Sequence, residues 1–563
     1  MPVAPETVRG ISEEVGRGTL VPQTPKREHF VESWLQDHLN AVAYAVVAAG
    51  FGLRLFVATR TYLNPDEALH YQIINQHSAW LAYKASLSNA HPPLIFLILY
   101  FWHFLGRSEL VLRIPSVILG TACCWMGFKW VKTVFGKAAG LIALILFAFS
   151  PAMVALSAEV RGYALLLFCM TTSLYFLARA LDDKSAGKMW YFSIFLYLAI
   201  VSHYSAIFYA VAIGLYAQAR LVDSQFPRNV VVAWIAGQLG AFAIYVFLYV
   251  THVSKLKNSI PMWSMPFEPA YFHSYSQTII GFTTMNTRNI FLFLFGQKYV
   301  AHIILLLFAA AVLYFFVRDL LFLQGNRQTG RSGILLSFPF IAVWGAALVG
   351  IYPYVGSRHT VFLAPFVIAG VSFLLAGISR RKLWAGLLIA ILLMAWSNTS
   401  AKPVEPSGSA GEQTPAMMAA AVTYMDQTIP QGDPIFVDMQ SSLPISYYFC
   451  GTEIVVQAET FGKTYFEFAC KGHPIISLHF WKAMAATFSP HFETMAHTHG
   501  LKPGDRVWVF QTGWGLSLST ELPKYDSRFR CLAPKNFGSG IAVIPFIVGP
   551  DLLPVTPSQS CPN

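Results

Sequence analysis

The sequence predicts an α-helical, polytopic membrane protein that ends in a small extracytoplasmic α/β domain. Of the 563 residues, 55% are hydrophobic and only 12% are charged, whereas soluble proteins carry about 25% charged residues. The mean hydropathy is +0.50. Eleven apolar stretches approach the length of a membrane-spanning helix, which takes roughly 20 residues. After residue 398 such stretches end, and beyond residue 415 shorter, strand-like segments replace them.

The predicted spans follow one another with short polar connections. They are residues 38–58, 110–131, 138–156, 161–181, 189–201, 204–220, 229–251, 299–317, 333–352, 359–378 and 383–398. One further apolar segment, residues 92–106, is shorter than a span and begins with two prolines. Its length favours a helix that lies in the membrane interface.

The rest of the chain divides by composition. Residues 1–37 are polar and carry proline and charge, which predicts a disordered cytoplasmic tail before the membrane domain of residues 38–398. Residues 399–415 are rich in Pro, Gly, Ser and Ala, as linkers are. Residues 416–563 are predicted to form the outer domain, with a helix at 415–427 and strands at 433–438 and 505–510.

The charge pattern predicts the orientation. The formal net charge is +11, but the basic residues gather in alternate short loops, which indicates topology and not nucleic-acid binding. These residues are Lys129, Lys132, Lys137, Arg179, Lys184, Lys188, Arg220, Arg228, Arg318, Arg327, Arg331, Arg380, Arg381 and Lys382. The positive-inside rule then places the N-terminus in the cytoplasm and the C-terminal domain outside, in a multi-pass protein of the plasma (inner) membrane.

The seven cysteines fall into two groups. Cys123, Cys124 and Cys169 lie in apolar stretches, where cysteine acts as a small hydrophobic residue. The other four lie in the C-terminal domain and could form disulfides if that domain is extracytoplasmic, but the sequence leaves their pairing open. They are Cys450, Cys470, Cys531 and Cys561.

A pair of carboxylates, Asp66 and Glu67, follows the first predicted span. In the local sequence Asn64-Pro65-Asp66-Glu67, asparagine is a good helix N-cap, proline suits the first helical position and acids favour the first turn. Glu67 could also close a capping box. The functional interpretation is that Asp66 acts as a general base on an acceptor hydroxyl, since a helix start holds a carboxylate well. The two interpretations are compatible.

Further polar residues converge on the predicted outer face. The candidate substrate-binding residues are His91, Arg113, Arg161, Tyr163, His203, Tyr204, Arg358 and His359, and Glu159 is a third candidate catalytic acid. All but Tyr163 have a structural alternative: snorkelling for Arg113, self-neutralisation for the Glu159/Arg161 pair and interfacial anchoring for His91, His203, Tyr204, Arg358 and His359. Ionisable groups at membrane depth are costly and are commonly functional, so their agreement on one face favours a site.

The order of these motifs resembles that of the GT-C glycosyltransferases, a superfamily that includes protein O-mannosyltransferases and lipid A aminoarabinose transferases. The shared features begin with Asp66-Glu67 in the first outer loop and His91-Pro-Pro-Leu94 at the start of a helix. They continue with Arg113-Ile-Pro-Ser116, Phe135-Gly136, Ser150-Pro151 and an acid in the second outer loop, Glu159. The similarity covers residues 38–220 well, and Glu159 with Arg161-Gly-Tyr163 is closer to the branch that modifies bacterial envelopes.

The resemblance implies transfer of a sugar from a polyprenyl-phosphate donor to an envelope glycan, lipid or protein acceptor at the outer face, with inversion at the anomeric carbon. Asp66 would be the general base, and His91, Arg113, Arg161 or Arg358 would stabilise the phosphate. Glu159 could orient the acceptor or share a divalent cation with Asp66, and the sequence leaves metal dependence open. The expected partners are this donor, the acceptor and membrane lipids, and no nucleic acid.

Three other function classes compete with this one. A transporter or flippase of lipid-linked glycans would show mid-span charges and repeat symmetry, and an envelope polymerase or ligase that uses lipid-diphosphate donors would not need Asp66-Glu67 beside His91-Pro-Pro-Leu94. A receptor-like protein would bind its ligand with the outer domain, and Asp66→Asn would then have no effect. Few charges lie within the predicted spans, and no internal repeat is evident. The sequence therefore favours the transferase.

Overall fold

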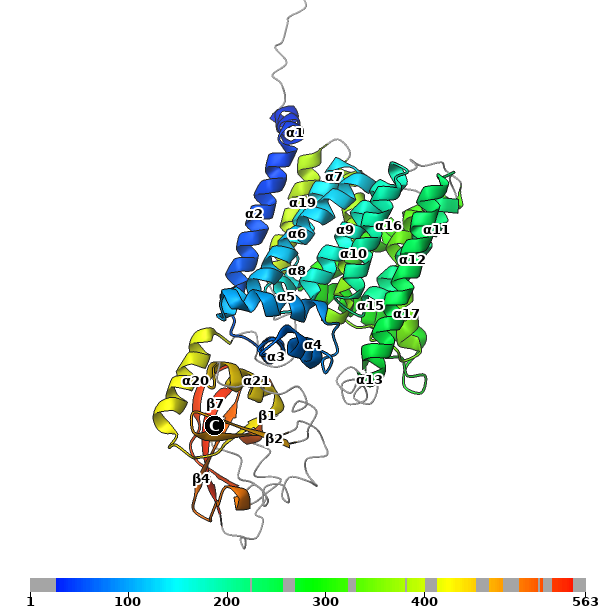
Figure 1. Cartoon of the computed structure of the whole chain (residues 1–563). Helices are drawn as coiled ribbons and strands as arrows, with labels where there is room; N and C mark the ends of the chain where they lie inside the picture. Colours follow the sequence, from blue (N-terminus) through cyan, green and yellow to red (C-terminus); the bar gives the residue numbers. More distant parts are fainter. Residues whose placement is uncertain are drawn as a thin grey trace, which may run out of the picture.

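The computed structural model describes residues 27–222, 225–256, 269–321, 331–379, 382–399, 413–451, 465–478, 496–514, 517–519 and 529–549. A helical domain is followed by a C-terminal α/β domain at one end of the helix bundle, and α1 lies at the other end (Figure 1). The helices of the helical domain are α1 (Arg27–Asp37), α2 (Leu39–Ala58), α3 (Pro65–Ile74), α4 (Ala79–Ser86), α5 (Leu94–Trp102), α6 (Glu109–Phe135), α7 (Lys137–Phe149), α8 (Pro151–Ser157), α9 (Tyr163–Asp182), α10 (Ala186–Ile200), α11 (Ala206–Val222), α12 (Arg228–Leu248), α13 (Ser254–Leu256), α15 (Ile279–Phe295), α16 (Lys298–Leu320), α17 (Ser332–Leu348), α18 (Ala364–Ile378) and α19 (Leu383–Thr399). Shorter helical turns are η1 (His103–Leu105), η2 (Tyr249–Val253) and η5 (Arg358–Leu363).

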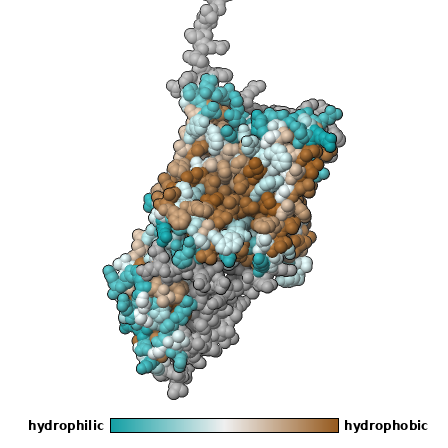
Figure 2. All heavy atoms as spheres, in the orientation of Figure 1, coloured by the Kyte–Doolittle hydropathy of each residue, from teal (hydrophilic) through white to brown (hydrophobic). Residues whose placement is uncertain are grey.

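The predicted spans coincide with helices of this domain. Within the described residues, six helices are long and apolar enough to cross a membrane, and the bent pair α7–α8 would make a seventh. Five further apolar helices are shorter: Leu94–Leu105, Ala186–Ile200, Ala206–Val222, Ser332–Leu348 and Leu383–Thr399. An apolar band crosses the visible face of the bundle between two hydrophilic ends (Figure 2). The polytopic helical fold is therefore confirmed.

The predicted third span is broken in the middle. α7 and α8 meet at an angle of 57° at Ser150-Pro151, because proline cannot supply the N–H that would continue the helix. The guanidinium of Arg54, fully buried in α2, donates hydrogen bonds to the carbonyls of Phe147 and Ala148 at 2.9 Å each. Arg54 thus satisfies the last carbonyls of α7, which would otherwise lack partners.

Two segments differ from the sequence-based predictions. α1 is a helix inside the stretch expected to be a disordered tail, of which residues 1–26 lie outside the described part. α15 lies between the predicted spans 229–251 and 299–317, where no further span was predicted. Its first half carries Thr, Asn and Arg, so hydropathy does not reveal it, while its second half, from Ile290 to Phe295, is largely buried. The segment 92–106 forms α5 and η1, and α5 lies across the end of the bundle (Figure 1).

The C-terminal domain is a mixed sheet with helices on one face. Its elements are α20 (Pro415–Thr428), β1 (Ile435–Asp438), α21 (Met439–Tyr448), β2 (Tyr465–Cys470), β3 (His473–Leu478), β4 (Arg506–Gln511), β5 (Phe529–Cys531), β6 (Lys535–Gly538) and β7 (Ile541–Val548). The strand order is β2-β3-β1-β4-β7-β5, with β6 also paired to β7. β1 runs parallel to β3 and β4, and the other pairs are antiparallel. The predicted helix and both predicted strands are present, which confirms a small α/β domain.

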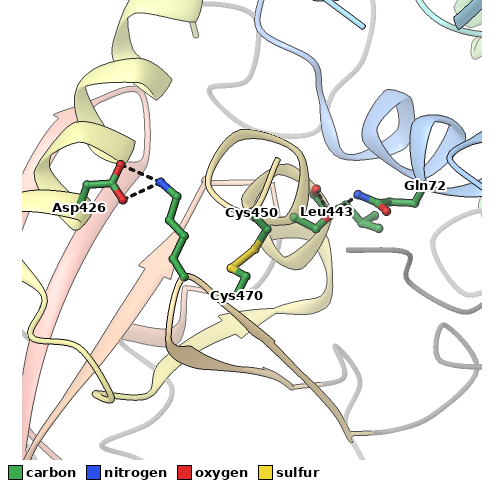
Figure 3. The surroundings of a disulfide bond; sticks show 7 residues. Gln72, Asp426, Leu443, Cys450 and Cys470 are labelled. Atoms are coloured by element: carbon green, nitrogen blue, oxygen red, sulfur yellow. Dashed lines mark hydrogen bonds and ion pairs between the residues drawn. A yellow bond between two sulfur atoms is a disulfide. The ribbon is translucent and has the colours of Figure 1, made fainter. Parts of the chain in front are cut away.

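A disulfide joins Cys450, just after α21, to Cys470 at the end of β2 (Figure 3). This bond identifies one pair among the four cysteines whose pairing the sequence left open. Cys561 lies outside the described residues. Cys123, Cys124 and Cys169 are free and buried among apolar helices, as predicted. Most of the predicted linker, residues 400–412, also lies outside the described part of the chain.

Candidate active site

The start of α3 carries the carboxylate pair at the end of the bundle that faces the C-terminal domain (Figure 1). Asn64 is the N-cap: its side chain accepts a hydrogen bond from the backbone N–H of Glu67 at 3.0 Å. The Glu67 carboxylate accepts the N–H of Asn64 in return at 3.1 Å, which completes a capping box. Pro65 occupies the first turn. The local pattern Asn-Pro-Asp-Glu therefore forms the helix start that its residues favour.

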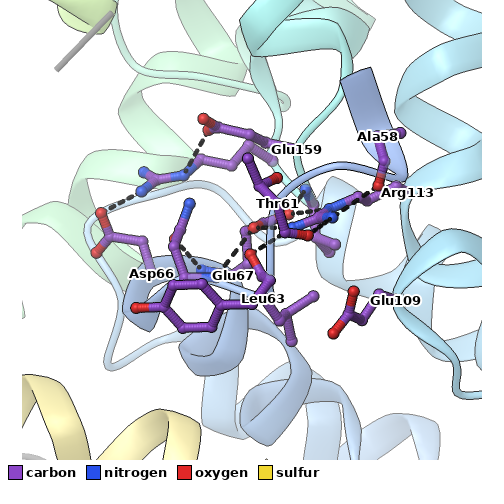
Figure 4. A network of polar contacts seen from close by, with 12 residues as sticks. Ala58, Thr61, Leu63, Asp66, Glu67, Glu109, Arg113 and Glu159 are labelled. Atoms are coloured by element: carbon purple, nitrogen blue, oxygen red, sulfur yellow. Dashed lines mark hydrogen bonds and ion pairs between the residues drawn. The ribbon is translucent and has the colours of Figure 1, made fainter. Parts of the chain in front are cut away.

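Glu67 is held in a fully buried ion pair with Arg113 from α6 (Figure 4). Arg113 donates Nε–H to Oε1 at 2.8 Å and Nη2–H to Oε2 at 2.6 Å. Its remaining N–H groups donate to three backbone carbonyls between α2 and α3, those of Ala58, Thr61 and Tyr62, at 2.7–2.8 Å. Glu67 Oε1 also accepts the N–H of Val160 at 2.8 Å.

This geometry bears on two of the predicted roles. An arginine has five N–H donors, and the five in Arg113 each have a protein partner. The exposed fractions of the Arg113 and Glu67 side chains are 0% and 1%. The arrangement favours a positioning role for both residues, and the catalytic role of Glu67 and the phosphate-binding role of Arg113 stay predictions.

Asp66, by contrast, is accessible and faces two arginines. Its side chain is 29% exposed. Oδ2 pairs with Nη2 of Arg161, in the turn between α8 and α9, and lies 3.0 Å from Nη1 of Arg358 at the start of η5. Burial alone would raise the pKa of Asp66, but the charges of Arg161 and Arg358 outweigh it and hold that pKa below its usual value. The carboxylate is therefore ionised and oriented.

Glu159 lies on the other side of the same guanidinium. Its Oε2 atom is 3.5 Å from Nε of Arg161, and its side chain is 24% exposed. Asp66 and Glu159, the two carboxylates that could share a divalent cation, are thus bridged by an arginine (Figure 4). The described residues contain no group of three His, Cys, Asp or Glu side chains arranged to hold a metal ion.

Three histidines and a tyrosine pack together beside Asp66. The His91 ring centroid lies 5.9 Å from that of His70 and 5.0 Å from that of His203. The Tyr163 ring contacts His91 and His203 at 6.0 and 5.1 Å. Burial lowers the pKa of His70 to about 4 and that of His203 to about 3, with Arg161 contributing in both cases. These imidazoles are therefore neutral at physiological pH.

The hydrogen bonds fix the tautomers of two of these rings. Nδ1 of His70 lies 2.7 Å from the Asp66 carbonyl, so it must donate, which leaves Nε2 as a bare acceptor. Nδ1 of His203 accepts the N–H of Ser205 at 3.1 Å, so the proton is on Nε2. Both Nε2 atoms are buried, and neither has a hydrogen-bond partner in the described part of the protein. His70 and His203 thus offer one acceptor and one donor, a combination that suits hydroxyl groups.

Two predicted site residues have other roles or partners. The Tyr204 hydroxyl bonds to Nδ1 of His252, at the end of the α12–η2 helix, at 2.5 Å. The carbonyl of His359 accepts a hydrogen bond from Tyr352 at 3.1 Å, and the two rings meet edge-on with their centroids 6.4 Å apart. The structure thus places His359 against Tyr352 and turns Tyr204 toward α12.

The roles of two residues, His70 beside the site and Arg54 within the bundle, were not predicted from the sequence. His70 follows Asp66 by four residues, a spacing that places both side chains on one helix face once α3 is recognised. Arg54 is the one charged residue in the first apolar stretch, 38–58, and a charge inside a span is itself a signal of function or of a special structural role. Here the role is structural, since it caps α7.

Comparisons with known proteins agree with this fold. Residues 90–253 match the family model "Dolichyl-phosphate-mannose-protein mannosyltransferase". The crystal structure of ArnT from Cupriavidus metallidurans bound to undecaprenyl phosphate is similar, with a TM-score of 0.51 and 13% identity over 91% of this chain and 98% of that one. ArnT in the apo state gives a TM-score of 0.52, with 12% identity over 90% and 98% of the two chains.

The archaeal oligosaccharyltransferase AglB from Archaeoglobus fulgidus, in complex with an inhibitory peptide and a dolichol-phosphate, is less similar. Its TM-score is 0.48, with 11% identity over 88% of this chain and 73% of that one. No curated protein sequence matches this chain. The family-model match falls on the segment that carries His91, Arg113, Glu159, Arg161 and His203. Residues 90–253 are thus similar to this mannosyltransferase family, and the fold of the chain is similar to that of ArnT.

Proposed function

We propose that this protein transfers a sugar from a polyprenyl-phosphate donor to an envelope glycan, lipid or protein acceptor at the outer face of the membrane. The observation that carries the proposal is Asp66: an accessible, ionised carboxylate at a helix start, between two arginines and a cluster of neutral histidines. The similarity to ArnT, which was crystallised with undecaprenyl phosphate, supports a lipid phosphate as the donor class.

In the proposed reaction, the acceptor hydroxyl attacks the anomeric carbon while Asp66 takes its proton. The bond from that carbon to the phosphate oxygen breaks, and the electron pair leaves with the phosphate. The products are an inverted glycoside and polyprenyl phosphate. A phosphate is a good leaving group, so the reaction needs a base and anion stabilisation more than a strong general acid.

Arg161 and Arg358 would bind both the Asp66 carboxylate and the donor phosphate. A guanidinium can bond a carboxylate and a phosphate at once, because its N–H groups point in several directions. A donor phosphate would draw part of the arginine charge away from Asp66, and the pKa of this carboxyl would then rise. Asp66 would therefore become a stronger base when the donor is bound. Glu159 keeps Arg161 oriented from the other side.

The histidine cluster would bind the sugar. The bare Nε2 of His70 and the protonated Nε2 of His203 are buried and need partners. Hydroxyl groups of a donor sugar can donate to the first and accept from the second. His91 packs against both rings of this pair, and Tyr163 packs against His203, which favours a neutral, hydroxyl-rich sugar over a charged one.

The proposed orientation places the site and the C-terminal domain outside the cytoplasm. The basic residues of the predicted cytoplasmic loops include Lys132, Arg179 and Arg318 in the last turns of α6, α9 and α16. The disulfide between Cys450 and Cys470 fits an oxidising compartment. Both observations agree with a plasma-membrane protein whose N-terminus is cytoplasmic.

A donor panel tests the proposal. The purified protein in lipid nanodiscs is incubated with polyprenyl-phosphate sugars that differ only in the sugar, and with the matching polyprenyl-diphosphate sugars. An envelope lipid and glycan extract is the acceptor source, and released polyprenyl phosphate and polyprenyl diphosphate are measured. We expect release with at least one neutral sugar. Release confined to polyprenyl-diphosphate donors would contradict the proposal and favour the envelope ligase.

A further inference from the structure

The C-terminal domain and the helical domain each insert a side chain into the core of the other. Tyr62, in the loop before α3, is 2% exposed and packs in the C-terminal core with Met418, Ile445 and Trp508. Leu443, on α21, is 4% exposed and belongs to the core of the helical domain. α21 packs directly against α3, the helix that begins at Asp66. Two apolar insertions in opposite directions fix how the domains meet.

Hydrogen bonds join the same two helices. Gln72 of α3 donates Nε2–H to the hydroxyl of Ser446 on α21 at 2.7 Å, and Figure 3 shows Gln72 reaching α21 beside Leu443. At the end of α21, the Tyr448 hydroxyl accepts the backbone N–H of Leu63 at 2.6 Å and donates its proton to Glu109 at the start of α6. Leu63 is fully buried, so Tyr448 is the partner of an N–H that water does not reach.

The bond at Leu63 lies next to the residue that starts α3. Leu63 immediately precedes the N-cap Asn64, and Asp66 follows two positions later. The loop between α2 and α3 is thus held from two sides: Arg113 binds the carbonyls of Thr61 and Tyr62 from within the helical domain, and Tyr448 binds the N–H of Leu63 from the C-terminal domain. A general base loses much of its effect when it moves by about 1 Å.

We propose that the C-terminal domain is a working part of the active site, in which Tyr448 is a positioning residue that fixes the start of α3 and thereby the place of Asp66. This rests on the proposed function, because it matters to catalysis only if Asp66 is the base. The Tyr448 hydroxyl is suited to this role, since burial, reinforced by the neighbouring Glu109 carboxylate, raises the pKa of Tyr448 far above its usual value. The hydroxyl therefore keeps the proton that it donates to Glu109.

The neighbouring tyrosine supplies a matched control. Tyr447 also lies on α21, and its hydroxyl donates to the carbonyl of Arg107 at 2.7 Å, so it too links the domains. That bond ends just before α6 and makes no contact with the loop of Leu63. Tyr448→Phe and Tyr447→Phe each remove one hydroxyl from the same helix and keep the ring, but only the first releases the residue before the N-cap of α3.

The test measures position and turnover in the full-length protein in nanodiscs. Hydrogen exchange followed by mass spectrometry reports the backbone of residues 59–74, and the donor assay gives kcat and KM. For Tyr448→Phe we expect exchange in 59–66 to rise at least tenfold and kcat to fall at least tenfold, with KM for the donor within twofold of wild type. Tyr447→Phe should keep both the exchange and kcat of wild type.

The outcomes separate the two claims. Equal exchange and equal kcat in Tyr448→Phe and wild type would overturn the inference, as would an equal loss of kcat in Tyr448→Phe and Tyr447→Phe. If Asp66→Asn retains wild-type turnover in the same assay, the proposed function fails. The exchange result then still decides whether Tyr448 holds the start of α3, without any reference to activity.

Discussion

The carboxylate of Glu67 and the guanidinium of Arg113 form a buried, two-pronged ion pair that joins the start of α3 to α6. Its neighbour Asp66 faces the opposite way, toward Arg161 and Arg358, and is partly exposed. Two adjacent acids in one helical turn thus have different roles, because Glu67 holds the helix in place and Asp66 is available to a substrate.

Glu67→Gln is expected to destabilise the protein. Removing one partner of a buried ion pair leaves the other charge uncompensated, which costs about 3–5 kcal/mol. Thermal unfolding in detergent measures the loss. Glu159→Gln is the control, because Glu159 is partly exposed and Arg161 keeps Asp66 as a partner. Equal melting temperatures for Glu67→Gln and Glu159→Gln would show that Glu67 does not support the fold.

The pH dependence of turnover should differ between the free enzyme and the donor complex. In the free enzyme, Arg161 and Arg358 hold the pKa of Asp66 below its usual value, so the base stays ionised and kcat/KM for the donor should not fall between about pH 8 and 5. With the donor bound, the phosphate shares the arginine charge and the pKa of Asp66 rises. As the pH is lowered, we therefore expect kcat to begin to fall at a higher pH than kcat/KM does. Profiles of kcat and kcat/KM that fall at the same pH would show that the donor phosphate does not change the pKa of Asp66.

Arg358→Gln tests whether Arg358 acts on both the donor phosphate and the Asp66 carboxylate. Arg358 lies 3.0 Å from Asp66 and is 17% exposed. Its loss should raise KM for the donor about tenfold, in line with roughly 1.5–3 kcal/mol for a hydrogen bond to a charged group. It should also raise the pKa of Asp66, so that the acidic limb of kcat/KM moves to higher pH. Steady-state kinetics across pH measure both effects, and an unchanged KM would exclude Arg358 from donor binding.

The C-terminal domain should become more stable in Asp438→Asn at neutral pH. Asp438 is 1% exposed and caps α21 by accepting the N–H groups of Gln440 and Ser441. Burial raises its pKa to about 6, partly offset by these hydrogen bonds. A raised pKa means that the unfolded state ionises first, so this carboxyl costs stability as pH rises from about 4 to 6, and the cost persists above pH 6. Asparagine keeps the cap and removes that cost.

Hydrogen exchange of β1 and β4, compared at equal pH, measures this effect. The variant should be more protected than wild type at pH 7.5, by about 2–3 kcal/mol at most, and equally protected at pH 4. Lower protection of the variant at pH 7.5 would show instead that the ionised carboxylate stabilises the cap.

The sequence predicted what depends on local composition. The apolar stretches became helices, and Asn64-Pro65-Asp66-Glu67 became a capped helix start, because length and capping are local properties. α15 was missed since only half of it is apolar. The role of Arg113 could not be read from its neighbours, because its partners are carbonyls more than 50 residues away in the chain.

The candidate site was predicted only in part, because its geometry depends on contacts between residues that are distant in the sequence. The approach of Asp66 to Arg161 and Arg358 depends on how α3, the turn after α8 and η5 meet in space. Sequence could place these residues on one face of the membrane, but not within one ion-pair network. Likewise, no local signal pointed to Tyr448, which acts on a backbone N–H 385 residues away.

The central claim is that Asp66 is the base of a polyprenyl-phosphate glycosyltransferase, and one comparison tests it most directly. Release of polyprenyl phosphate from the accepted donor is measured with wild type and with Asp66→Asn, alongside their melting temperatures. We predict that the variant keeps its fold and loses at least a hundredfold in rate, as expected when a general base is removed. A variant that folds normally and turns over at the wild-type rate would contradict the claim.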